Sequence, residues 1–216
     1  MKRLVVTFVC ILALAAFADA DIIAQFTFPT GVVQTNAATT IAGNVTPSLF
    51  NVYSNAVSFL TPATMIYSGG NPASAANKSG NIWLGDSATN GFYGFTLTLD
   101  PGYALNVTDL RFDGRATATG VTNILAQYSV DNVTFFTLGS GTYANDSNWH
   151  TNICNTSVPS GLTGTNYFRI YGFGPNNGAF NVDNVTMNGT VIPEPGSMAL
   201  IGIGMLGLII LRRKVR

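Results

Sequence analysis

The sequence predicts an all-β protein built as an antiparallel β-sandwich, and three observations support this fold class. Lysine and glutamate, which favour surface helices, are almost absent from the central part of the chain, where Thr, Asn, Gly and Ser take the polar positions. Several stretches alternate apolar and polar residues with the period that a half-buried strand requires. No helical periodicity separates these stretches, so the strands are expected to pair as neighbours in antiparallel sheets.

The strand signals follow one another along the chain. The first covers residues 23–28, and residues 29–80 after it are the least readable part, either a long loop or short irregular strands. In FYGFTLTL, residues 92–99, the side chains of Phe95, Leu97 and Leu99 share one face. Further strands are predicted at 103–113, 124–130, 134–138, 166–173 and 179–191, with a hairpin turn at Asp131-Asn132.

The N-terminus has the pattern of a signal peptide. Lys2 and Arg3 precede an apolar run from 4 to 17, and Ala18-Asp19-Ala20 has the small-x-small form that signal peptidase accepts. We therefore expect residues 1–20 to be removed by signal peptidase before Asp21, which leaves residues 21–190 as the exported sandwich. We expect residues 21–192 to fold without either apolar end, because the strand pattern is complete without them.

Residues 191–216 combine three features in order. Pro193-Glu194-Pro195 comes first, an uncharged apolar run at about 197–211 follows, and Arg212, Arg213 and Lys214 stand near the end. A helix through this run would be about 22 Å long, and basic side chains that snorkel would let it span a bilayer core of about 30 Å. Basic residues stay on the cytoplasmic side, so the sandwich is expected outside.

This order of features resembles the PEP-CTERM sorting signal of Gram-negative bacteria, although Val191-Ile192 stands where a single Val usually precedes the first Pro. The resemblance implies an exosortase-type processing enzyme as a partner. It also implies a transient anchor in the inner membrane with a cytoplasmic C-terminus, followed by release to the cell surface or the extracellular matrix. A plain C-terminal tail anchor is the alternative, and neither reading says what the protein does.

Part of the central region carries a second resemblance. The stretches LRFDGRATATG (110–120), YFRIYGFG (167–174) and FNVDNVTMNGT (180–190) resemble the β-sandwich ectodomains of many PEP-CTERM proteins. Those ectodomains look like jelly rolls related to galactose-binding domains. The resemblance implies a jelly-roll-like fold and a surface location more than it implies a ligand.

Charge and cysteine content exclude some classes of function. Residues 21–192 hold four basic residues and eight aspartates, a net charge near −4. Nucleic-acid binding needs a basic stripe, so we expect no nucleic-acid partner. Cys154 is the one cysteine of this part, which excludes a disulfide within it and favours a buried thiol.

The sequence gives little support to catalysis. His150 and Cys154 are four residues apart, and on a strand that spacing separates them by about 13 Å, too far for a hydrogen-bonded dyad. A glycosidase needs two carboxyl groups across a cleft. The candidate pairs are Asp109 with Asp113 and Asp131 with Asp183, but solvated turn aspartates are the simpler interpretation. We therefore predict no catalytic residues.

Metal and cofactor sites are also weakly indicated. Asp183 and Asn184, near the asparagines at 176–177, offer the oxygen ligands that calcium prefers, so they are weak candidates for a structural calcium site. Zinc is excluded because structural sites need about four His or Cys ligands. The G-x-G-x-x-G of residues 202–207 lies inside the apolar run, with no strand before it, so it predicts no nucleotide cofactor.

Aromatic side chains are the remaining indication of function, because sugar-binding sandwiches stack aromatic rings on pyranose rings. Trp149 follows the polar residues 145–148 and is expected nearer the surface than Trp83, so Trp149 is the candidate glycan contact. The prediction is a non-catalytic adhesion or carbohydrate-contacting module, with extracellular polysaccharide as its partner. The alternatives are a secreted polysaccharide hydrolase that uses aspartates and a purely structural surface protein.

Overall fold

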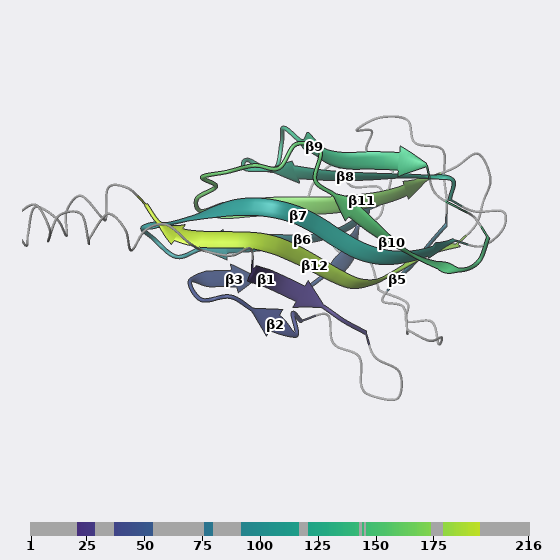
Figure 1. Ribbon diagram of the computed structural model, residues 1–216, viewed down its shortest axis with the longest axis horizontal. Helices are drawn as coiled ribbons and strands as arrows, with labels where there is room; N and C mark the ends of the chain where they lie inside the picture. Colours follow the sequence, from purple (N-terminus) through teal and green to yellow (C-terminus); the bar gives the residue numbers. More distant parts are fainter. Residues whose placement is uncertain are drawn as a thin grey trace, which may run out of the picture.

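The computed structural model describes residues 21–28, 37–53, 76–79, 92–116, 121–142, 144, 146–173 and 179–194. These residues form two antiparallel sheets that pack face to face, and no helix occurs within those ranges (Figure 1). The predicted all-β sandwich is confirmed. The predicted signal peptide at 1–20 and the predicted membrane helix at about 197–211 lie outside the described residues.

The first sheet, called sheet A, contains the long strands of the molecule. β7 (Tyr103–Ala116) and β12 (Ala179–Pro193) run side by side along its length (Figure 1). The strand order is β10 (Trp149–Cys154), β7, β12, β1 (Asp21–Phe26) and β2 (Thr40–Ile41), and β5 (Ala76–Ser79) also pairs with β12. β12 is therefore an internal strand, with β7 on one edge and β1 and β5 on the other.

The second sheet, called sheet B, covers the inner face of sheet A. Its order is β3 (Val45–Pro47), β6 (Phe92–Leu99), β11 (Thr165–Phe173), β8 (Asn123–Ser129) and β9 (Phe136–Thr142), and β4 (Asn51–Tyr53) also pairs with β6. The β8–β9 hairpin is the one that the sequence predicts around Asp131-Asn132. Asp131 Oδ1 accepts hydrogen bonds from the backbone N–H groups of Val133 and Thr134, and Asn132 adopts a positive φ.

The core between the sheets is built mainly from aromatic rings. Phe26 of β1 meets Phe95 of β6 with ring centroids 5.0 Å apart, and Phe95 stacks on Phe168 of β11 at 5.3 Å. All three side chains are buried. A phenylalanine buries roughly 150–250 Å², so a few such rings supply much of the apolar area that holds the sheets together.

Two further contacts fix β12 in the sandwich. The hydroxyl of Tyr93, in sheet B, donates a buried hydrogen bond to the carbonyl oxygen of Phe180, in sheet A. At a bulge in β12, Gly189 lies so close to β7 that a Cβ atom there would collide with the carbonyl oxygen of Asn106. A glycine is therefore required at this close approach of the two strands.

The predicted strands agree with most of the observed ones, and the differences lie at the sheet edges. β6 has the bounds that its alternation predicts. β10 has no strand prediction, and the region 29–80 contains the short strands β2 to β5. β12 continues to Pro193, so the predicted boundary between sandwich and sorting signal at residue 190 falls inside a strand.

Candidate functional site

The outer face of sheet A around β10 and β7 presents the candidate site. On β7, Leu110, Phe112 and Ala116 are buried in the core, so the alternate residues Arg111, Asp113 and Arg115 point outward. Register places Trp149 opposite Arg115, Thr151 opposite Asp113 and Ile153 opposite Arg111. We call the residues Trp149, Thr151, Arg115, Asp113 and Asn184 the sheet-A site.

Trp149, the predicted glycan contact, lies half-buried on this face. The guanidinium carbon of Arg115 lies 5.1 Å from the centroid of the indole ring, the geometry of a cation–π contact. The indole Nε1 atom is buried and finds no hydrogen-bond partner among the residues that the structure describes. Trp149 is thus held by Arg115 and remains partly open to solvent.

Asp113 lies beside this pair and organises the polar groups of the site. Its Oδ1 atom accepts a hydrogen bond from the hydroxyl of Thr151 at 2.6 Å. Its Oδ2 atom accepts one from the side-chain amide of Asn184 at 2.8 Å. Hydroxyl, amide and carboxylate groups are therefore linked on the same face of the sheet as the Trp149–Arg115 pair.

Asp183 faces Asp113 across β12 and β7, but it is only 1% exposed. Its Oδ1 atom accepts hydrogen bonds from the backbone N–H groups of Phe28 (3.1 Å) and Asn184 (2.7 Å), where β12 bulges and Asn184 adopts a positive φ. Burial raises the pKa of Asp183, the two backbone donors lower it, and the neighbouring Asp113 raises it further.

The interpretation of the acidic residues as solvated turn aspartates is therefore wrong for three of the four. Asp109 and Asp113 lie in β7, and Asp183 is buried in β12 because the bulge supplies it with backbone donors. Only Asp131 lies in a turn, where the N–H groups of Thr134 and Val133 and the hydroxyl of Ser129 lower its pKa to about 2. The candidate pair of Asp131 and Asp183 is not brought together, since Asp131 follows a strand of the other sheet.

The weak calcium candidates Asp183 and Asn184 are adjacent on the bulge, while residues 176–177 lie outside the described residues. Donors already occupy Oδ1 of Asp183 and both carboxylate oxygens of Asp113. Within the described part of the chain, no group of three or more His, Cys, Asp or Glu side chains could hold a metal ion.

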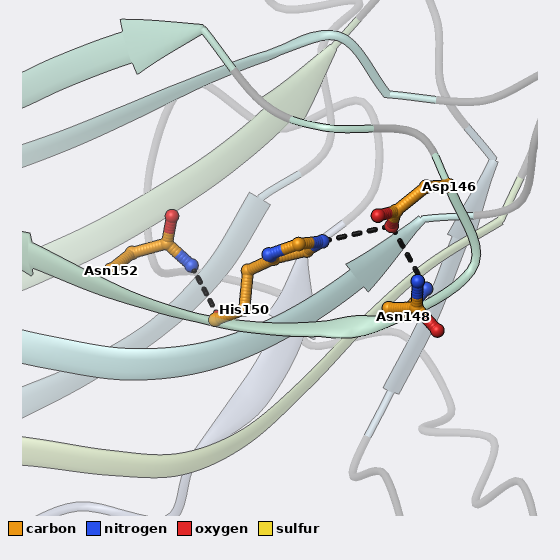
Figure 2. Close-up of polar contacts among 4 residues, drawn as sticks. All are labelled: Asp146, Asn148, His150 and Asn152. Carbon is orange, nitrogen blue, oxygen red and sulfur yellow. Dashed lines mark hydrogen bonds and ion pairs between the residues drawn. The ribbon is translucent and has the colours of Figure 1, made fainter.

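His150 forms a separate polar cluster where β10 begins. Its Nε2 atom lies 2.8 Å from Oδ1 of Asp146, which also accepts the backbone N–H of Asn148 at 3.0 Å; Figure 2 shows both contacts. These bonds, with the one from His150 as the largest cause, hold the pKa of Asp146 well below its usual range. The side-chain amide of Asn152 donates to the backbone carbonyl of His150 (Figure 2).

Cys154, at the other end of β10, has no contact with this cluster. Its side chain is buried against Gly139, and burial raises its pKa to about 11. A thiol with that pKa stays protonated at neutral pH and is a poor nucleophile. The expectation of a buried structural thiol is met, and a dyad of His150 with Cys154 does not form.

Sequence reasoning missed a second cluster, on the outer face of sheet B. The guanidinium of Arg169 is buried over the ring of Phe135, 3.3 Å from its centroid, and its Nε atom donates to Oε1 of Gln127 at 2.9 Å. The alternation in YFRIYGF predicts that Arg169 and Tyr171 share a face, but not that they are buried. Because Arg169, Tyr171 and Phe92 are at most 3% exposed, this cluster is packing and not an open surface.

The end of β12 is the third feature of interest. Pro193 pairs with Tyr103, and the backbone N–H of Glu194 donates to the carbonyl oxygen of Gly102 at 2.8 Å. Residues 191–214 match a family model. This segment is a PEP-CTERM protein-sorting motif. The PEP-CTERM motif thus begins inside the folded sandwich, while Pro195, Arg212, Arg213 and Lys214 lie beyond the described residues.

The described residues contain no helix that is long and apolar enough to cross a membrane. A comparison with curated proteins gives no match.

Adhesin and carbohydrate-binding domains are among the solved structures with some likeness to the chain. The K3 adhesin domain of Lys-gingipain from Porphyromonas gingivalis is 13% identical, with a TM-score of 0.40 over 79% of this chain and 99% of that one. The family 11 carbohydrate-binding module of a Clostridium thermocellum cellulase is 15% identical, with a TM-score of 0.35 over 81% and 97%. A xylan-binding domain from CBM 22 is 15% identical, with a TM-score of 0.37 over 80% and 97%. At these sequence identities and TM-scores, the ligands of those domains cannot be assigned to this chain.

Proposed function

We propose that the protein is exported, processed at its PEP-CTERM motif by an exosortase-type membrane enzyme, and displayed at the cell surface or in the extracellular matrix. There it contacts carbohydrate without cleaving it. The motif at residues 191–214 supports the sorting part of this proposal. The observation that carries the carbohydrate part is the partly open Trp149 ring, stacked with Arg115 beside the polar groups of the sheet-A site.

The chemistry of this site suits a sugar ring. A pyranose has an apolar face of C–H groups that packs against an aromatic ring, and hydroxyl groups that need donors and acceptors at the edge of that ring. Arg115 and the second amide hydrogen of Asn184 supply donors, and the hydroxyl oxygen of Thr151, whose hydrogen goes to Asp113, supplies an acceptor. Because Arg115 and Asp113 are already held by their neighbours, little side-chain entropy is lost when a ligand binds.

The membrane arrangement follows from the chain ends. The signal peptide at 1–20 starts export, and the apolar run at about 197–211 holds the protein in the inner membrane until processing. The basic residues Arg212, Arg213 and Lys214 keep the C-terminus in the cytoplasm, as basic flanks of membrane helices do.

A hydrolase that uses aspartates has less support. Asp113 and Asp183 do face each other, but Asp183 is buried and bonded to the backbone, so it has no access to a polysaccharide. Asp109 accepts a hydrogen bond from Asn188 at 2.8 Å and is not paired with Asp113. A purely structural surface protein differs from our proposal in one observable way, since it would bind no glycan.

The test is a glycan-array and polysaccharide pull-down with residues 21–194, scored for binding and for cleavage products. We expect binding without cleavage, and we expect Trp149→Ala to weaken it about tenfold or more, a loss of about 1.4 kcal/mol. Phe136→Ala is the matched control, because Phe136 is a half-exposed aromatic residue of sheet B, away from the site. Equal loss in both variants, or no binding at all, would contradict the carbohydrate proposal.

The sorting proposal has its own test. Replacing Pro193, Glu194 and Pro195 by alanine in the full chain should leave unprocessed protein in the inner membrane of a host that carries the enzyme. Fractionation and the mobility of the protein on a gel report the result. Normal processing of this variant would rule out recognition through the motif.

A further inference from the structure

The sandwich holds the first residues of the sorting motif in its own sheet. Residues of β12 pair with β7 to the end of the strand, with Val191 opposite Leu105, Ile192 opposite Ala104 and Pro193 opposite Tyr103. The N–H of Glu194 then bonds to Gly102. The motif begins at residue 191, so its residues 191–194 belong to the folded domain.

Side-chain and backbone contacts both hold this segment. Val191 packs against the hydrophobic core. Leu105, its partner in β7, is fixed on the opposite edge by two backbone hydrogen bonds with Leu162, of 2.8 and 3.0 Å. β7 therefore stays in place if the end of β12 moves away, and the two segments can separate without unfolding the rest of the sheet.

The last residues of β12 also have neighbouring strands on fewer sides than the rest of the strand. β1 begins at Asp21, opposite Gly189, so residues 190–193 have β7 as their one neighbour among the described strands. Strand ends with fewer neighbours open at a lower free energy than internal positions. Local opening here is thus the cheapest way to expose the motif.

The membrane segment follows almost at once. From Glu194 to Ser197, where the apolar run begins, the chain can span at most roughly 11 Å. A folded domain held so close leaves little room for a membrane enzyme to reach the motif. Enzymes that bind extended peptides also use backbone N–H and C=O groups, and in residues 191–194 part of these groups are engaged with β7.

We propose that the sandwich shelters its own sorting motif, and that the processing enzyme gains access only when residues 190–194 detach from β7. This inference rests on the proposed sorting function. The rate of processing is then set by the fraction of molecules in which this end of β12 is open, because only that fraction is competent to bind.

The experiment locks the strand end with a disulfide. In the full chain, Ala104→Cys with Ile192→Cys joins residues that lie directly opposite each other, a spacing that a disulfide bridges. We expect the oxidised variant to accumulate unprocessed in the inner membrane and the reductant-treated variant to be processed. The matched control, Arg111→Cys with Thr186→Cys, locks the same two strands outside the motif and should be processed at the wild-type rate.

A second variant keeps the inference testable if the lock disturbs folding. Inserting Gly-Ser-Gly-Ser between Ile192 and Pro193 frees the Pro-Glu-Pro segment from β7 and should speed processing about threefold or more. Processing of the oxidised lock at the wild-type rate, or no gain from the insertion, would overturn the inference.

Failure of the sorting proposal is distinguishable from failure of this inference. If the wild-type chain is never processed, the sorting proposal is wrong. Hydrogen exchange at the Glu194 amide then tests separately whether the motif is sheltered. Protection of that amide supports a sheltered motif, and exchange at the rate of an unstructured peptide overturns it.

Discussion

The side chain of Asp183 provides a hydrogen-bond acceptor at a position where sheet A is interrupted. It lies where β1 ends and β5 begins along the same edge of β12, and its carboxylate accepts the N–H groups of Phe28 and Asn184 there. Without this acceptor two backbone donors would lose their partner inside the protein. A buried donor without a partner costs about 1–3 kcal/mol.

We therefore predict different effects from two substitutions of Asp183. Asp183→Ala should lower the free energy of unfolding by about 1–3 kcal/mol, since the acceptor is lost. Asp183→Asn keeps an oxygen acceptor and removes the charge beside Asp113, so its stability at neutral pH should equal or exceed that of the wild type. Urea unfolding followed by circular dichroism measures both.

The pKa shift of Asp183 determines in which direction the stability of the protein changes with pH. The folded pKa of Asp183 is raised above 3.8, so the folded state binds this proton more tightly than the unfolded state does. The contribution of Asp183 to stability is therefore present below the unfolded pKa and is lost as pH rises through the folded pKa. The advantage of Asp183→Asn over the wild type should grow over that window, and a constant difference would refute the raised pKa.

Residues of the candidate site could be predicted from the sequence only in part. The polar residues before Trp149 place it near the surface, and the structure puts it half-buried on an outer face. Its contact with Arg115 could not be predicted, because it depends on the register of β10 against β7. The burial of Asp183 depends in the same way on a bulge that leaves no pattern in the sequence.

At the scale of the element, β12 and β7 pair along most of their length, and at Gly189 they lie too close for a side chain. Its absent side chain makes room for the carbonyl oxygen of Asn106. That neighbour is backbone in a paired strand, so it cannot move aside as a flexible side chain would. The bulge at Asn188 and Gly189 therefore depends on glycine.

We predict that Gly189→Ala lowers the free energy of unfolding by about 1–3 kcal/mol, the usual effect of overpacking. Gly141→Ala is the control, because a Cβ atom there meets no other atom within 4 Å. The control should change stability by no more than about 0.5 kcal/mol. Thermal or urea unfolding of both variants measures the difference, and equal effects would show that the close approach does not matter.

The elements that sequence patterns predict best are those buried on one face along their whole length. FYGFTLTL alternates clearly because β6 lies inside sheet B with a core face and an outer face. WHTNIC, in β10, has no such alternation, because this edge strand buries mainly Cys154. The short strands β2 to β5 owe their existence to pairing with long neighbours, which no local pattern reveals.

At the scale of the whole molecule, the described strands of the sandwich lie between Asp21 and Pro193. Both ends of this range lie in sheet A, where Asp21 pairs with Gly189. We therefore expect the domain to need neither apolar end of the chain for its core. The last residues of β12 do belong to it, because Val191 packs against the core.

We predict that residues 21–194 fold alone and that truncation at Gly189 weakens the domain. The shorter fragment leaves residues 103–106 of β7 without their partners in β12. The expected loss is about 1–3 kcal/mol, with the β-sheet circular dichroism spectrum retained. A spectrum of disorder from residues 21–194, or equal stability of the two fragments, would contradict this account.

The central position of β12 determines how the molecule carries a mechanical load. In the proposed arrangement, the C-terminal segment is held at the membrane and a ligand on the outer face of sheet A, so tension enters the domain along β12 from its end. Over most of residues 179–189, where β12 is paired on both edges, the hydrogen bonds lie across the direction of pull and are loaded in shear. Once residues 190–194 have detached, the rest of β12 therefore resists such a pull through its pairing with neighbours on both sides.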